Sequence, residues 1–215
     1  MAKMRGNYSN KSKPLGDADG EERMTSIWTE PKFGIGQRCI LIETPQGNVL
    51  WDCITYLDDE TIELISGKGG LKAIVISHPH YYTTHLDWAW AFDCPVYIAQ
   101  DDEEWLSRRD DDGRRKLFTS ASEEILKEVT AIKTGGHFPG SLVLLWRKKL
   151  MIADSFVTTP VCLPLARSFR CHSVINPGAK LTRRTVRAVS CGSASRNNII
   201  RFHVGSAEHD TLAAR

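Results

Sequence analysis

Short strand-like runs and short helical segments alternate along the middle of the chain. Residues 38–43 and 48–53 are apolar or β-branched runs, and the turn between them contains Pro45 and Gly47, which predicts a hairpin. Residues 58–66 begin with acidic side chains and end at Gly67, a pattern typical of a short helix with a glycine stop. The apolar run at residues 71–77 then predicts a buried strand.

The same alternation continues to about residue 153. We expect a helix at 84–92 capped by Thr84, a strand at 95–99, a helix at 102–107 opened by Asp101, a charged loop at 108–115, a short helical turn at 122–128, and a second hairpin formed by 141–146 and 150–153. These pieces predict a mixed β-sheet with helices packed against it, which places the chain in the α/β (α+β) class.

Charge and composition divide the chain near residue 156. Residues 1–155 carry a net charge of −5 and residues 156–215 a net charge of +7, while every Trp and Tyr precedes residue 147. We therefore expect a polar, disordered N-terminal tail at 1–26, a folded domain at 27–157, and a basic, Ser/Arg-rich, poorly ordered tail at 158–215.

Several classes of protein are disfavoured by composition. The longest apolar runs are far shorter than the roughly 20 residues of a membrane-spanning helix, and the polar N-terminus resembles no secretory signal. We expect a cytoplasmic protein without a membrane partner. The six cysteines are widely spaced with no CxxC pair, so neither a disulfide framework nor a zinc ribbon is expected, and Cys39, Cys53 and Cys94 should be buried free thiols.

Candidate chemistry gathers where the predicted strands end. His78 and His80 directly follow the apolar run at 71–77, and the fixed φ of Pro79 should place both imidazoles on the same side. His137 lies in a Gly-Gly-His turn, and Asp154 closes the last apolar run. Three imidazoles and a carboxylate can converge on one metal ion. The alternative, surface or capping histidines, is disfavoured because loops at strand ends carry function.

These motifs resemble the metallo-β-lactamase superfamily. The resemblance rests on the sequences Leu50-Trp51-Asp52-Cys53, Ser77-His78-Pro79-His80, Gly135-Gly136-His137 and Ile152-Ala153-Asp154, and it covers roughly residues 27–157. It implies an αββα sandwich of two similar halves with zinc or another divalent metal at one edge, and hydrolysis of esters, thioesters, lactams, lactones or phosphodiesters. By motif it assigns His78, His80 and His137 to the first metal and Asp154 to the bridging carboxylate.

The chain also departs from the family pattern His-x-His-x-Asp-His. Tyr82 stands where the Asp is expected and Thr83 where the fourth His is expected, so a second metal loses two ligands. His85 and Asp87 could replace them if the loop bulges; otherwise His85 is a helix-start residue beside Tyr81. The basic tail offers no convincing distal ligand among His172, His203 and His209. We therefore expect one ion, zinc or alternatively iron or manganese, in a sandwich whose second half is incomplete.

Two functions remain open. The first is a metal-dependent hydrolase of an ester, lactone or thioester that uses a metal-bound water, with Asp154 holding the water or completing the metal shell, and Tyr82 or Tyr81 donating to a developing oxyanion. The second is a non-catalytic metal-binding or metal-free relative that acts as an interaction protein, and this alternative includes a truncated gene product.

A small-molecule substrate is the expected partner, and the oligomeric state is left open. Nucleic acid is disfavoured although the tail is basic, because the tail has no Trp or Tyr that could stack on bases.

Overall fold

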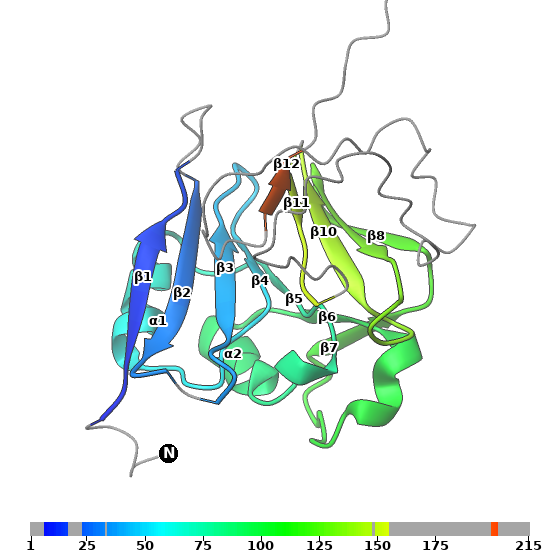
Figure 1. Ribbon diagram of the computed structural model, residues 1–215, viewed down its shortest axis with the longest axis horizontal. Coiled ribbons are helices and arrows are strands. Elements are labelled where there is room, and N and C mark those ends of the chain that lie inside the picture. The colour runs from blue at the N-terminus through cyan, green and yellow to red at the C-terminus, as the bar shows by residue number, and fades with distance from the viewer. Residues whose placement is uncertain (1–6, 17–22, 33, 148, 155–198, 202–215) are drawn as a thin grey trace, which may run out of the picture.

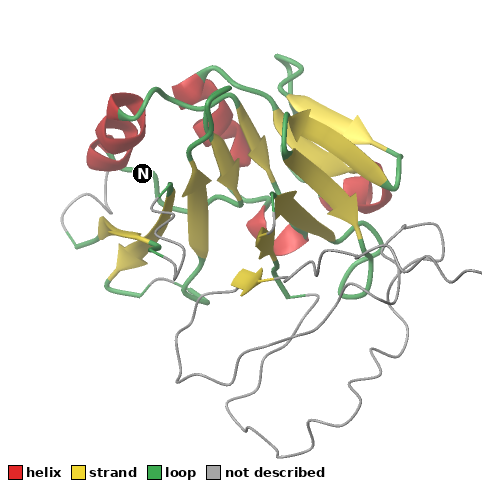
Figure 2. Cartoon of the chain, turned by 90° about the horizontal axis from the view of Figure 1, so that it is seen from above, coloured by secondary structure: helices red, strands yellow, loops and turns green. Residues whose placement is uncertain are grey.

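Two β-sheets pack face to face, with helices on the outer face of the first sheet. The structure is a computed structural model that describes residues 7–16, 23–32, 34–147, 149–154 and 199–201. Figure 1 shows the blue and cyan strands of the first sheet beside the green and yellow strands of the second, and Figure 2 shows the helices on the outer side. The fold class expected from the sequence is confirmed.

The first sheet has the order β1-β2-β3-β4-β5-β6-β7. Its strands are β1 (Ser9–Pro14), β2 (Met24–Glu30), β3 (Arg38–Ile42), β4 (Val49–Trp51), β5 (Ala73–Val75), β6 (Val96–Ala99) and β7 (Arg115–Phe118). Strands β1 to β4 pair antiparallel and β4 to β7 pair parallel. Parallel neighbours need crossover connections, and helices supply the first two.

These two helices are α1 (Asp59–Gly67) between β4 and β5, and α2 (His85–Phe92) between β5 and β6. The Asp58 carboxylate caps α1 by accepting from the Thr61 backbone N–H at 2.9 Å. Thr84 precedes α2 as expected, but its hydroxyl donates to the Ile54 carbonyl at 3.1 Å instead of capping the helix. Both predicted helices are therefore present.

Each face of the first sheet supports its own apolar core. Ile65 of α1 and Trp88 of α2 pack on the outer face against strand residues such as Leu50 and Ile74. The inner face meets the second sheet across a core that includes Val49, Trp51, Val75, Leu144 and Trp146. Alternate residues of each strand thus serve different layers, as the period of two requires.

The second sheet is antiparallel, in the order β12-β11-β10-β9-β8. Its strands are β8 (Ser122–Leu126), β9 (Val129–Lys133), β10 (Leu142–Trp146), β11 (Lys149–Met151) and β12 (Ile199–Arg201). Val143, Leu150 and Ile152 form a third cluster on its outer face. The described residues therefore supply the αββ layers of the expected αββα sandwich, and the prediction of an incomplete second half concerns residues outside them.

The prediction of a disordered N-terminal tail at residues 1–26 is wrong for those of its residues that the structure describes. Strand β1 pairs with β2 along its whole length, and Leu15 and Met24 are buried. The polar sequence of β1 gave no strand signal. Strand β1 is nevertheless stable at the edge of the sheet, because an edge strand tolerates lysines and a proline on its open side. Within the expected C-terminal tail, residues 199–201 pair with β11; its other residues lie outside the described part.

Two local predictions also need correction. Residues 122–126 form strand β8 and not a helical turn, because Ile125 must face the core between the sheets and Glu128 adopts the left-handed turn to β9 (φ 68°). The expected helix at 102–107 is a 3₁₀ segment, η3 (Gln100–Trp105). The described cysteines, Cys39, Cys53 and Cys94, are buried and free as expected. No described helix has the length and apolar character needed to cross a membrane.

Candidate metal centre

The first two histidines leave the carboxyl end of β5. His78 continues the strand in an extended conformation (φ −167°), and Pro79 then begins a single 3₁₀ turn, η2 (Pro79–Tyr81), that carries His80. In an open parallel sheet the carboxyl ends of the strands face the same edge, where ligands usually bind. The proline turn therefore delivers both imidazoles to that edge.

The third histidine comes from the loop between β9 and β10 in the second sheet. Gly135 (φ 66°) and Gly136 (φ 98°) allow the sharp turn before His137 because both adopt left-handed conformations. The Leu142 backbone N–H donates to the Ser77 carbonyl at 2.8 Å, which ties the start of β10 to the end of β5. The sheets thus meet where the histidines meet.

Four residues, named here the His/Asp group, converge at this place: His78, His80, His137 and Asp154. One ligand atom from each lies within 4.8 Å of all the others. His80 Nδ1 lies 3.2 Å from His78 Nε2 and 3.4 Å from His137 Nε2. Asp154 Oδ2 lies 3.5, 3.8 and 3.9 Å from the nitrogens of His78, His80 and His137 respectively.

These separations fit a metal ion. Tetrahedral zinc with bonds near 2.0–2.1 Å sets its ligand atoms about 3.3 Å apart. The two imidazole pairs match that spacing, and the carboxylate is a few tenths of an ångström farther away. The arrangement therefore suits three imidazole ligands, with Asp154 placed either as a fourth ligand or beside an open position.

A buried hydrogen-bond chain fixes the tautomer of His78. The Ser77 backbone N–H and hydroxyl both donate to the Asp52 carboxylate, at 2.7 and 3.0 Å, and the same hydroxyl lies 2.8 Å from His78 Nδ1. When Asp52 is ionised, the serine proton goes to its carboxylate, and His78 Nδ1 is then the donor to Ser77. The lone pair of Nε2 is then left facing the His/Asp group, as a metal ligand requires.

Burial sets the protonation of this chain. It lowers the pKa of His78 to about 4, assisted by repulsion from His80 and His137 and opposed by Asp154. His78 is therefore neutral at pH 7 and free to coordinate. Burial also raises the pKa of Asp52 to about 7, against the two hydrogen bonds from Ser77 that favour its charged form. The ionised form of Asp52 is the one that accepts both hydrogen bonds from Ser77 and so orients His78.

Two predicted site residues lie elsewhere. His85 is buried, its Nδ1 faces the Tyr82 carbonyl, and its Nε2 accepts from Arg115 Nε at 2.8 Å. Both nitrogens are engaged, so the expectation that His85 joins the metal ligands is wrong. Tyr82 is buried in the core between the helices and the first sheet, with its ring 6.0 Å from that of His85. Tyr82 therefore packs in this core, at the position where the motif resemblance expected an aspartate.

Tyr81 and Thr83, on either side of Tyr82, lie in different surroundings. Tyr81 is the tyrosine that contacts the site, with its ring 5.4 Å from that of His78, although its hydroxyl is hydrogen-bonded to the Arg38 backbone. Thr83 lies beside Thr55, with 3.4 Å between the hydroxyl oxygens.

Sequence reasoning assigned no role to Asp52, Ser77 or Phe138, which surround the histidines. The sequence signal for the first two was their position at the ends of adjacent parallel strands.

No family model matches the chain. The protein YmaE of Bacillus subtilis (strain 168), described as uncharacterized, is 45% identical over 128 residues. The match covers 60% of this chain and 46% of YmaE, so the chain spans about half the length of this relative.

Solved structures with a similar fold include metallo-β-lactamase SMB-1 in complex with mercaptoacetic acid, at a TM-score of 0.44 and 16% identity over 58% of this chain and 55% of that one. Another is an N-acyl homoserine lactone hydrolase with the product N-hexanoyl-L-homoserine at its catalytic metal centre, at a TM-score of 0.40 and 19% identity over 51% of this chain and 57% of that one.

Proposed function

We propose that this protein is a metal-dependent hydrolase of a small-molecule ester, lactone or thioester. The observation that supports it is the convergence of three imidazoles and one carboxylate at an open sheet edge. Three histidine donors with a further position open to solvent are the donor set of catalytic zinc sites. His80 and Asp154 keep 46% and 51% of their side-chain surface exposed, so a substrate can reach the group. Zinc is the proposed ion, with iron or manganese as alternatives.

When bound, a divalent ion supplies a Lewis acid that polarises a carbonyl and lowers the pKa of water to near 7. The chain itself supplies orientation and a proton acceptor. Ser77 and Asp52 hold the His78 ring so that Nε2 faces the group. Asp154, whose Oδ2 lies 3.5 Å from His78 Nε2, is the carboxylate of the group and would accept the proton of a water bound there. Phe138 stacks near His78, at 5.9 Å between ring centroids, and shields one side of the group.

A non-catalytic relative that acts as an interaction protein is the second proposal. It is favoured by the positions of Tyr82 and His85, which are turned into the core and held there. Among the described residues, the His/Asp group therefore has one carboxylate, Asp154. Tyr82 and His85 supply no ligand to a second metal ion. If the protein does catalyse hydrolysis, Asp154 is the one general base that the His/Asp group offers.

Metal analysis of the purified protein tests both proposals. We expect close to one bound ion per chain, lost in a His80→Ala variant and kept in a His85→Gln variant, because only the first removes a ligand. Esters, lactones and thioesters assayed with and without chelator then separate an enzyme from a binder. Hydrolysis that is insensitive to chelator and to His137→Ala would overturn the hydrolase proposal, and metal binding without hydrolysis would support the alternative.

A further inference from the structure

One exposed tryptophan lies beside the His/Asp group. Trp105 ends η3 with 53% of its surface exposed, whereas Trp51, Trp88 and Trp146 are buried. Trp90 is also exposed, at 44%, but its indole donates to Asp112 at 2.8 Å and lies under the Arg108 guanidinium. Trp105 instead meets another aromatic ring, that of Phe138, edge to face at 5.5 Å.

Phe138 connects Trp105 to the metal ligands. Its ring centroid lies 4.7 Å from that of His137, 5.3 Å from that of His80 and 5.9 Å from that of His78. The Phe138 backbone is held by Ser141, whose hydroxyl accepts from the Phe138 N–H at 2.9 Å. A continuous aromatic surface therefore runs from the three imidazoles to the exposed indole.

A buried contact holds the two parts of this surface together. The Asp102 side chain is fully buried, and its Oδ1 accepts from the Gly140 N–H at 2.8 Å. A Cβ on Gly140 would lie 2.8 Å from the Asp102 carboxyl, so this close approach needs glycine. Because Asp102 belongs to the same short segment as Trp105, this contact ties the backbone of η3 to the loop of His137. A preorganised surface of this kind binds without a large ordering cost.

The segment that leads to Trp105 carries exposed negative charge. Glu103 and Glu104 are exposed and directly precede it, while the nearby Asp101 is paired with Lys133 at 2.5 Å. Two exposed carboxylates adjacent to Trp105 in the sequence disfavour an anionic group at this segment, whereas an uncharged apolar group would bury aromatic surface on the indole.

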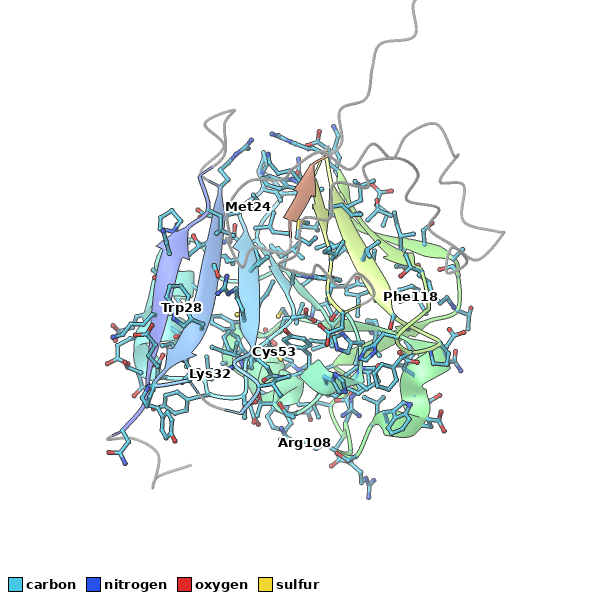
Figure 3. All side chains as sticks on the ribbon, in the orientation of Figure 1. Met24, Trp28, Lys32, Cys53, Arg108 and Phe118 are labelled. Carbon is cyan, nitrogen blue, oxygen red and sulfur yellow. The ribbon has the colours of Figure 1, made fainter. Side chains whose placement is uncertain are left out.

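We propose that Trp105 and Phe138 form the subsite for an uncharged apolar acyl chain whose carbonyl lies at the His/Asp group. This subsite rests on the proposed hydrolase function and narrows its substrate class to medium-chain acyl esters, lactones or thioesters. Trp90 on α2 is the matched exposed tryptophan outside the subsite. It packs against Arg108, which Figure 3 shows at the lower edge of the molecule.

The test compares Trp105→Ala with Trp90→Ala in the zinc-loaded protein. With 4-nitrophenyl octanoate, kcat/KM should fall about tenfold in Trp105→Ala and change less than about twofold in Trp90→Ala, because burial of a few methylenes is worth this much. With 4-nitrophenyl acetate both variants should stay within about twofold, and Trp105→Phe should recover most of the octanoate activity. Equal effects on octanoate and acetate, or no effect of Trp105→Ala, would overturn the subsite.

A binding measurement keeps this test separate from the hydrolase proposal. Octanoate and the dicarboxylate suberate are titrated calorimetrically into the zinc-loaded protein. Octanoate should bind more tightly than suberate, and about tenfold more weakly to Trp105→Ala than to Trp90→Ala. If no ester is hydrolysed but this pattern holds, the hydrolase proposal fails and the subsite stands. If octanoate fails to bind, or binds both variants equally, the subsite is wrong whatever the esterase assay shows.

Discussion

His78 follows β5 and His85 begins α2, and both histidines are buried, with 2% and 1% of their surfaces exposed. In each, burial lowers the pKa to about 4. They differ in what their nitrogens contact. Ser77 engages one nitrogen of His78 and leaves the other facing the His/Asp group, whereas Tyr82 and Arg115 engage both nitrogens of His85.

Burial and a depressed pKa therefore do not identify a metal ligand by themselves. Both histidines are neutral at pH 7, which coordination requires, and both are rigidly held. His78 differs because the lone pair of its Nε2 faces the other potential metal ligands of the His/Asp group. The partner of the second nitrogen decides the role, because a hydrogen-bond donor such as Arg115 competes for the lone pair that a metal would use.

Matched glutamine substitutions should show the largest difference between the two histidines. We expect His78→Gln to lose stoichiometric metal binding, and His85→Gln to keep it while the free energy of unfolding falls by about 1–3 kcal/mol from the buried hydrogen bonds. Metal content by mass spectrometry and urea unfolding measure the two effects. Equal loss of metal from both variants would show that His85 is also required for the site.

Removing the charge behind His78 should have the next largest effect. Asp52→Asn keeps a residue that tolerates the left-handed conformation at this position (φ 61°) but weakens the orienting chain, so metal affinity should fall about 10–100-fold. Asp58→Asn is the control, because Asp58 caps α1, asparagine can cap a helix in the same way, and metal affinity should not change. Competition with a chromogenic chelator measures affinity, and an equal loss in both variants would contradict the role of Asp52.

The pH dependence of stability should show the cost of burying His85. Its folded pKa of about 4 lies below the unfolded value near 6.5, so the unfolded state binds the proton more tightly. The stability that the neutral ring contributes is complete above pH 6.5 and is lost as the pH falls toward 4.

Over that range the metal-free protein should therefore lose up to about 1.4 kcal/mol per pH unit more than a His85→Gln variant does. Urea unfolding at several pH values checks this, and parallel curves for the two proteins would refute it.

The sequence predicted much of this site because its ligands are local to strand ends. The pattern at 71–80 predicted a strand followed by two ligands, and the Gly-Gly turn predicted the loop of His137, so the His/Asp group could be named from motifs. The sequence could predict neither strand β1 nor the hydrogen bonds that keep His85 away from the His/Asp group. Both depend on partners distant in sequence: β2 in one case and Arg115, thirty residues later, in the other.

The smallest expected effect concerns Tyr82, which the sequence suggested as an oxyanion donor. Its ring packs between the helices and the first sheet, beside His85, while Tyr81 is the residue against His78. Tyr82→Phe should therefore change kcat by less than about twofold and stability by about 1 kcal/mol or less, since it removes a hydroxyl and keeps the ring. Steady-state assays on the hydrolysed ester check this. A loss of about a hundredfold, the effect of removing an oxyanion donor, would restore Tyr82 to the reaction and show that the loop rearranges when substrate binds.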